Sequence, residues 1–341
     1  MSQISEAAKS YIADSDLNTA AEVAMHLGQP LLLTGEPGTG KTSFAEYLAE
    51  VLAPRFFQCG PLPLHRFETK STSSAADLFY RFDSLKRLQS TRVEGMSQDN
   101  RDYISFQALG LAILESLPWS EVDDLLPDRA DHPPVPTRSV VLIDEVDKAP
   151  RDFPNDILNE IDRMFFRIPE VPPRATAAGL PASRSHSRDV HANKTLRPVV
   201  ILTSNREKNL PDAFLRRCIF HNIVFPDRKS KHRMADIVIA NLGAPSRELV
   251  HDALEFFYDV REKGGLERAP ATAELVQWIK SLEYRFARLQ ETGKWSGVAP
   301  ARITQLPQDE LLATLGVLGK KAHDLGQLRK LVEARYAGPN R

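Results

Sequence analysis

The sequence predicts an α/β protein in which a doubly wound parallel sheet is followed by an all-helical region. Short apolar runs bounded by Gly or Pro alternate with segments of helical periodicity, which is typical of parallel strands joined by helices. After about Asp227 the strand signals stop and only helical periodicity continues. We therefore predict a sheet domain over residues 1–227 and a helical domain over 228–341.

The elements of the sheet domain follow in order along the chain. A helix over 17–27 ends at Gly28, and Pro30 then opens a short buried strand. The next helix begins at Thr42 and stops at Pro54, because proline breaks the interior of a helix. The remaining expected elements are strands over 65–70, 140–143 and 199–203, and helices over 74–82 and 154–164.

Two stretches interrupt this alternation. Residues 81–136 begin with charged residues and contain an apolar segment over 106–117. Residues 169–196 are rich in Pro, Ala, Ser and Arg and show little periodicity, so we predict a mobile surface loop. In the second domain the periodicity predicts helices over 231–241, 247–263, 272–291, 308–318 and 323–336.

Composition and charge argue against several classes of protein. Hydrophobic residues make up 42%, charged residues 26%, and the net charge is −1, so the footprint of a dedicated nucleic-acid binder is missing. The N-terminus does not resemble a signal peptide, and the apolar runs are too short to span a bilayer, so we expect a soluble cytoplasmic protein with no membrane partner. Cys59 and Cys218 are expected to be small buried hydrophobes, with no zinc site.

A phosphate-binding loop lies between the first strand and the following helix. Every fixed position of the pattern is filled by the run Gly35, Glu36, Pro37, Gly38, Thr39, Gly40, Lys41 and Thr42. The glycines let consecutive N–H groups point at phosphate oxygens, and Lys41 can reach the β- and γ-phosphates. The Thr42 hydroxyl can ligate Mg²⁺. The sequence therefore predicts an ATP site with Mg²⁺ as the cofactor ion.

A pair of carboxylates ends the strand over 140–143. Asp144 and Glu145 follow four apolar residues, at the strand end where ligands bind in such sheets. Asp144 would hold Mg²⁺, and Glu145 would polarise the attacking water as general base. Alone, the pair would equally fit a solvated strand end; the preceding loop favours the functional interpretation.

Two further groups extend the hypothesis. Asn205 follows the strand over 199–203, where its side chain would contact the γ-phosphate or the lytic water; the alternative is a turn residue. Arg216 and Arg217 close a short helix, where they would neutralise its dipole or act as an arginine finger on a neighbouring subunit.

Together these motifs resemble the AAA+ ATPases, and their order and spacing are similar to the MoxR branch. The resemblance covers about 20–227 and is strongest over 141–149, 153–158 and 203–218. It implies a doubly wound sheet with a helical lid, assembled as a homo-oligomeric hexamer with ATP between subunits.

Residue roles carry over from this resemblance by position. Lys41 and Thr42 match the Walker A pair, Asp144 and Glu145 the Walker B pair, and Asn205 sensor 1. Arg217 lies where the finger arginine falls, with Arg216 as second candidate, and Arg268 resembles sensor 2 or is a surface residue at a helix start. The chain departs from the branch at Ser204-Asn205-Arg206, where Gln-Asn-Pro is frequent, and at Arg216-Arg217-Cys218, where Asp-Arg-Phe is frequent.

The sequence leaves three candidate functions. The resemblance and the neutral charge favour an ATP-driven remodeller or maturation chaperone acting on a protein client, with a von Willebrand A domain protein as a partner. The alternative is a nucleic-acid motor or loader, which would use the basic residues of 169–196: Arg174, Arg184, His186, Arg188, His191 and Lys194. The third is a nucleotide-gated binding module, which the presence of both carboxylates disfavours.

Overall fold

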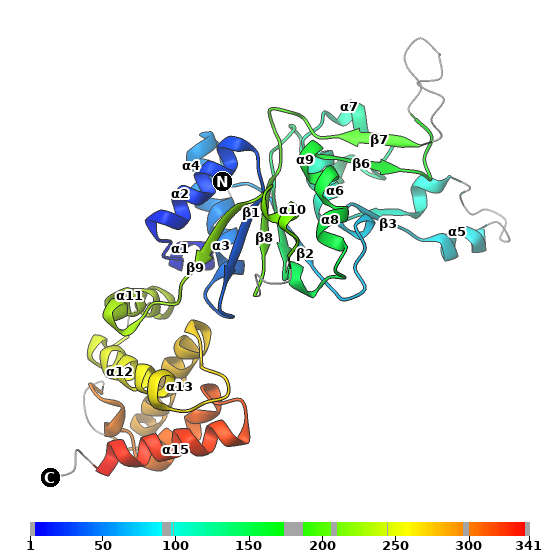
Figure 1. Ribbon diagram of the computed structural model, residues 1–341. Helices are drawn as coiled ribbons and strands as arrows, with labels where there is room; N and C mark the ends of the chain where they lie inside the picture. The colour runs from blue at the N-terminus through cyan, green and yellow to red at the C-terminus, as the bar shows by residue number, and fades with distance from the viewer. Residues whose placement is uncertain are drawn as a thin grey trace. The chain divides into compact units, whose positions relative to one another are not determined.

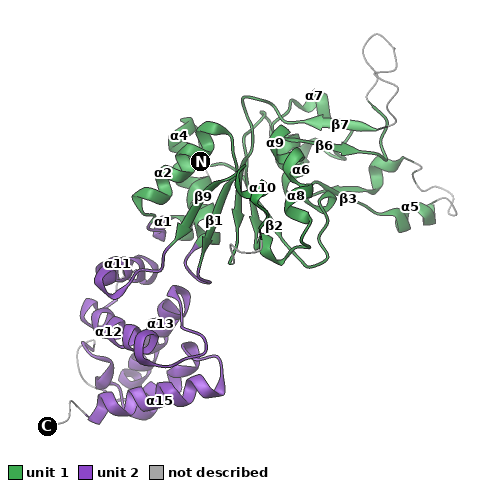
Figure 2. Cartoon of the chain, in the orientation of Figure 1, with its two compact units in different colours: residues 1–8, 13–35, 41–223 green, residues 9–12, 36–40, 224–341 purple. Residues whose placement is uncertain are grey.

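The computed structural model describes residues 4–90, 97, 99–173, 187–205, 210–243, 245–295 and 300–337. The chain forms two compact units (Figure 2). The first unit contains residues 1–8, 13–35 and 41–223, and the second contains 9–12, 36–40 and 224–341. Most of the phosphate-binding loop therefore groups with the helical unit, although the strand and helix on either side of it belong to the first unit.

Five parallel strands form the central sheet of the first unit (Figure 1). In chain order they are β1 (Leu31–Gly35), β2 (Leu64–Glu68), β5 (Val140–Asp144), β8 (Val199–Thr203) and β9 (Ile219–Ile223). Their spatial order is β2-β5-β8-β1-β9, and every neighbouring pair is parallel. The predicted doubly wound parallel sheet is confirmed. Strand β9, which the sequence analysis did not predict, extends the sheet beyond β1.

Helices cover both faces of this sheet. Helices α2 (Ser15–Leu27) and α3 (Lys41–Tyr47) contact it on one side, and α6 (Ala108–Glu115), α8 (Phe153–Asp156) and α9 (Leu158–Arg163) lie on the other (Figure 1). Because both faces are covered, the three inner strands β1, β5 and β8 are buried along almost their whole length, which explains their continuous apolar runs.

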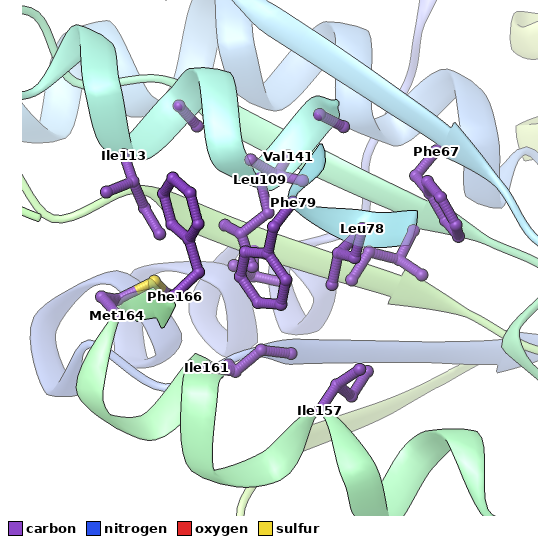
Figure 3. Close-up of a cluster of buried hydrophobic side chains, with 14 of the residues drawn as sticks. Phe67, Leu78, Phe79, Leu109, Ile113, Val141, Ile157, Ile161, Met164 and Phe166 are labelled. Carbon is purple, nitrogen blue, oxygen red and sulfur yellow. The ribbon is translucent and has the colours of Figure 1, made fainter. Parts of the chain in front are cut away.

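A cluster of buried hydrophobic side chains fills the space between the sheet and the helices α6, α8 and α9 (Figure 3). The rings of Phe79 and Phe166 stack at 5.5 Å between centroids, and both side chains are almost completely buried. Leu109 and Ile113 of α6 reach the same cluster. Alternate residues of the strands, such as Val141 of β5, point into it because side chains in a strand alternate between faces.

The helix after the phosphate-binding loop continues past Pro54, so the predicted stop there is wrong. α3 is followed by a π-helical turn, η1 (Leu48–Leu52), and by α4 (Ala53–Phe57). In this turn the N–H of Ala53 donates to the carbonyl of Leu48, five residues earlier. The wider turn loosens the backbone just where the proline ring would otherwise clash with the preceding turn.

Two small two-stranded antiparallel sheets differ from what the sequence predicts. The helix expected over 74–82 is instead the short turn η2 (Ala76–Leu78) and the strand β3 (Tyr80–Phe82), which pairs with β4 (Ile104–Phe106). The stretch 169–196 is not all loop, because β7 (Arg188–His191) pairs with β6 (Phe165–Ile168). Only Val190 in β7 is a buried apolar residue, so the strand has no readable alternation. Residues 174–186 lie outside the described part.

The stretch 81–136 contributes to the core rather than lying outside it. Its apolar segment forms α6, whose central residues Leu109 and Ile113 are fully buried. Besides β3 and β4, the described part of this stretch contains the short elements α5 (Ser84–Ser90), η3 (Asn100–Tyr103), α7 (Trp119–Val122) and η4 (Arg129–Asp131).

The second unit is helical, and its five predicted helices are confirmed to within a few residues. They are α11 (Lys231–Leu242), α12 (Arg247–Lys263), α13 (Thr272–Glu291), α14 (Gln308–Thr314) with η9 (Leu315–Val317), and α15 (Ala322–Ala337). Trp278 of α13 is fully buried among them and donates from its indole N–H to the Thr314 hydroxyl at 2.9 Å. No helix in the described part of the chain has the length and apolar character needed to cross a membrane.

The two cysteines differ in their surroundings. Cys59 is exposed, so the expectation that it is buried is wrong, because it follows the end of α4 at the surface. Cys218 is partly buried before β9, and burial raises the pKa of its thiol to about 12.

Candidate functional site

Three glycines shape the loop between β1 and α3. Gly35, Gly38 and Gly40 have φ angles of 138°, 78° and 90°, a region that side-chain-bearing residues rarely adopt. Gly38 is also closely approached, since a Cβ added there would lie 2.7 Å from the Cβ of Ala271. The loop can therefore curl only because glycine occupies these positions.

Lys41 and Thr42 open α3 directly after this loop. The Lys41 side chain is almost fully buried, with 7% exposure, and its Nζ donates to the Gly35 carbonyl at 2.8 Å. This bond folds the ammonium back across the loop. The Thr42 hydroxyl donates to Asp144 Oδ2 at 3.1 Å, so the second motif lies against the first.

Asp144 is the last residue of β5 and accepts bonds from two hydroxyls. Besides Thr42, the buried Thr203 at the end of β8 donates to Asp144 Oδ1. Among the described residues no cationic side chain forms an ion pair with Asp144. Two neutral hydroxyls thus orient the carboxylate, whose charge interacts with that of Lys148 without forming an ion pair, and its oxygens are of the kind that a divalent cation prefers.

Glu145 turns sharply away from the strand. Its φ of 54° places the backbone in the left-handed region, and its N–H donates to Thr203 Oγ1 at 2.8 Å. The Glu145 carboxylate accepts from Asn205 Nδ2 at 3.3 Å and pairs with Lys148. The hydrogen bond to Glu145 raises the pKa of Lys148.

Asn205 reaches the same end of the sheet from β8. The N–H of Ser204 donates to the Leu33 carbonyl at 2.9 Å, which continues the pairing with β1. The N–H of Asn205 then donates to Asp147 Oδ1 at 3.1 Å. The structure thus brings Lys41, Thr42, Asp144, Glu145 and Asn205 to the carboxyl end of β1, β5 and β8.

The candidate finger arginines lie at the opposite end of the sheet. They follow α10 (Asp212–Leu215) and precede β9, whose first residue, Ile219, donates its N–H to the Pro30 carbonyl before β1. Arg217 donates to the Ala213 carbonyl at 2.9 Å and pairs with Asp162 Oδ2 at 3.0 Å. Arg216 is exposed and makes no side-chain hydrogen bond to the described residues.

The second unit holds the loop residues 36–40 through α12. Arg261 donates to Glu36 Oε2 at 2.8 Å and to the Pro270 carbonyl, and its guanidinium lies 3.8 Å from the centre of the Phe225 ring. Arg268 is 58% exposed and lies 3.7 Å from Glu274. Ala271 and Glu274, rather than Arg268, approach Gly38, and the sensor 2 role of Arg268 stays a prediction.

Four residues with direct contacts to the predicted functional residues were not predicted from the sequence. Thr203 joins Asp144 to Glu145, Asp147 holds the Asn205 backbone, Lys148 pairs with Glu145, and Asp162 holds Arg217. A polar residue ending a buried strand was a readable signal for Thr203. The other three depend on contacts that short-range spacing does not show.

One basic side chain of the loop predicted over 169–196 is buried rather than exposed to solvent. Arg188 is buried, pairs with Asp124 and donates to the Glu121 carbonyl at 2.7 Å, so it does not face solvent. The His191 ring stacks on Phe165 at 5.1 Å. Lys194 is exposed, while Arg174, Arg184 and His186 lie outside the described residues.

One protein-family model matches the part of the chain that contains these motifs. Residues 25–179 match the model of the AAA domain family, a stretch somewhat shorter than half of the chain. It contains the phosphate-binding loop and both carboxylates. No curated protein matches the chain.

Several solved structures are similar to the chain at low sequence identity. A point mutant of Thermotoga maritima RuvB is 14% identical with a TM-score of 0.46, covering 92% of this chain and 73% of that one. The T. maritima RuvB Holliday junction branch migration motor is 15% identical (TM-score 0.42; 91% and 69% covered). A katanin structure concerned with self-assembly is 13% identical (TM-score 0.41; 95% and 89% covered). Similarity at this level carries no argument about function.

Proposed function

We propose that this protein binds ATP with Mg²⁺ in the loop Gly35–Thr42 and hydrolyses it. The observation that carries the proposal is the contact of Thr42 with Asp144 at 3.1 Å, next to Glu145 and Asn205. A P-loop hydroxyl, a strand-end aspartate and a neighbouring glutamate are the groups that this chemistry requires.

The residues fit the proposed ligands. The loop carries three glycines with positive φ and so can present its N–H groups to phosphate oxygens. Thr42 and Asp144 offer neighbouring oxygens of the kind that Mg²⁺ prefers, without a protein cation between them. When bound, the ion would supply positive charge that offsets the charge developing on the phosphates.

The chain's own residues would then act as follows. Lys41 would exchange its bond to the Gly35 carbonyl for phosphate oxygens. Glu145 would accept a proton from the attacking water, and its bond from Asn205 would fix the direction of the carboxylate. The ion pair between Glu145 and Lys148 would have to open for the carboxylate to act as a base.

The arginines favour a site shared between subunits. Arg217 lies at the amino end of β9, whereas the loop lies at the carboxyl end of β1, the next strand. Five residues of strand span roughly 16 Å, so this arginine would serve another subunit's nucleotide rather than its own. Its Nε and Nη1 are held by Asp162 and Ala213, which would orient Nη2 toward a partner. This supports a homo-oligomeric ring, such as a hexamer.

Within that ring we favour a MoxR-like remodeller that acts on a protein client. The burial of Arg188 weakens the alternative of a nucleic-acid motor, because it removes one cation from the proposed phosphate-contacting loop. The client and a von Willebrand A domain partner remain part of the proposal, as implied by the resemblance.

ATP turnover of the purified chain, with and without duplex DNA at two salt concentrations, tests the proposal. We expect Mg²⁺-dependent turnover that DNA does not change. Absence of turnover in an assembled ring would overturn the hydrolysis proposal. A salt-sensitive stimulation by DNA would overturn the remodeller in favour of the motor.

A further inference from the structure

We propose that the amino end of the sheet carries a second anion site, which binds a small carboxylate or phosphate. The site is a cavity of about 290 Å³ in the first unit, lined by the end of α2, by Arg138 and by the segment that leads into β8. It is separate from the phosphate-binding loop, which lies at the opposite end of the same strands, and it does not depend on the proposed ATPase function.

Three cationic side chains line this cavity. Arg138 donates to the carbonyls of Arg197 and Thr195 at 2.6 and 2.5 Å and lies 3.7 Å from the centre of the Phe57 ring. Arg197 donates to the carbonyls of Gly28, Ile161 and Asp162 at 3.0, 2.9 and 3.1 Å. These bonds fix both guanidinium groups in place. Lys194 is exposed at the rim.

The cations have no carboxylate partner at this site. The lining contains no Asp or Glu, and none of the three cations forms an ion pair with a described residue. The carbonyl partners include the ends of α2 and α9, whose negative dipole ends offset part of the charge. Burial lowers the pKa of both Arg138 and Arg197, although the charge of Asp162 acts in the opposite direction for Arg197. A bound anion would offset the part of the free-energy cost of burying these guanidinium groups that the hydrogen bonds to carbonyls do not offset.

Donors remain for a ligand after the internal bonds are made. A guanidinium has five N–H groups. Arg197 uses its Nε and Nη2, so both hydrogens of Nη1 stay available, and the Nε of Arg138 is likewise not used within the described residues. Fixed planar donors of this kind match the oxygens of a carboxylate or phosphate.

The walls of the cavity favour a small organic anion over a bare ion. Met25, Leu27, Phe57 and Met164 supply apolar surface beside the cations. Small-molecule sites combine apolar walls with a few fixed polar groups, and this cavity lies at the lower end of their usual size, about 300 Å³.

Calorimetric titration of the full chain tests the proposal. The Lys41→Ala background removes the main phosphate contact at the loop, and the probes are inorganic phosphate and succinate in separate titrations. Lys194→Ala, a residue whose side chain bonds to no described residue and so should not disturb folding, is expected to weaken binding about fivefold. Arg138→Gln should weaken it more. Lys86→Ala on α5, also exposed, serves as the matched control and should leave affinity unchanged.

The outcomes separate the ligand classes. Binding of phosphate alone would support a tetrahedral oxyanion, and binding of succinate alone would support a carboxylate. Failure of both probes to bind would overturn the proposal. Binding that neither Lys194→Ala nor Arg138→Gln weakens would also overturn it, because the anion would then sit elsewhere.

Discussion

The two ends of the central sheet carry side chains of opposite charge with different kinds of partner. At the carboxyl end, the carboxylates of Asp144 and Glu145 meet hydroxyl, amide and ammonium donors from neighbouring strands and loops. At the amino end, the hydrogen bonds of Arg138 and Arg197 to the described residues all go to backbone carbonyls, and Arg138 also lies over the face of an aromatic ring.

The difference follows from the direction of parallel strands and from what precedes and follows them. All five strands end at one edge, so polar residues that follow several apolar runs gather there. Helices α2 and α9 end near the other edge, and their carbonyl groups attract cations. The carboxyl end of the sheet therefore suits Mg²⁺ together with a bound phosphate group. The amino end suits an anion without a metal ion.

Arg217→Ala tests the largest consequence of this separation. If the arginine at the amino end serves a neighbour's carboxyl end, its loss should lower kcat by about 10³-fold or more, as for other arginine fingers. Mixing Arg217→Ala with Lys41→Ala subunits should restore part of the ATPase rate, because each supplies a different half of one site. Absence of rescue at every ratio would contradict a shared site; Arg216→Ala should have a smaller effect.

Glu145→Gln tests the carboxyl end alone. The amide keeps the size of the side chain but cannot accept the proton from water, so kcat should fall by about 10²- to 10⁴-fold. Equilibrium binding of a fluorescent ATP analogue should stay unchanged, and the melting temperature serves as the control for folding. Turnover near the original rate would show that another group is the base.

The reactivity of Cys218 tests the burial of the segment that follows Arg217, the candidate arginine finger. Burial raises its thiol pKa to about 12 from 9.0, so at pH 8 the folded protein holds far less thiolate than the unfolded chain. The lower thiolate fraction outweighs the greater nucleophilicity of a more basic thiol, and alkylation should be about thirtyfold slower in the folded state. Mass spectrometry of iodoacetamide-labelled peptides, with and without urea, measures the ratio; equal rates would contradict a buried thiol.

Asp162→Asn should have the smallest effect. The Asp162–Arg217 pair is nearly half exposed, so it contributes at most about 1 kcal/mol, and unfolding should be almost unchanged. We expect kcat to fall about fivefold with KM for ATP unchanged, because the carboxylate only orients the arginine. Asp162→Glu should recover part of the rate, and Asp156→Asn on α8 is the control. A shift in KM instead would argue against a positioning role.

The helical unit was the easier half to predict. The bounds of α12 and α13 agree with the predicted 247–263 and 272–291, because the apolar periodicity and the ends of a helix are written within the helix itself. The two small antiparallel sheets were not predicted, because their strands are specified by pairing with distant segments rather than by local pattern. Tyr80 finds its partner Phe106 far along the chain, and β7 is a strand only because β6 lies beside it.

The sequence by itself determined the parallel sheet and the residues that follow its strands, since the loop, Asp144-Glu145 and Asn205 each stand directly after a buried apolar run. It also determined the order of the helices in the second unit. Only the tertiary structure decided which groups share a site: Thr203 between Asp144 and Glu145, Asp162 on Arg217, and Arg138 with Arg197 at the amino end. Local patterns specify a strand and its polar end, but pairing between distant side chains depends on how the strands and helices pack.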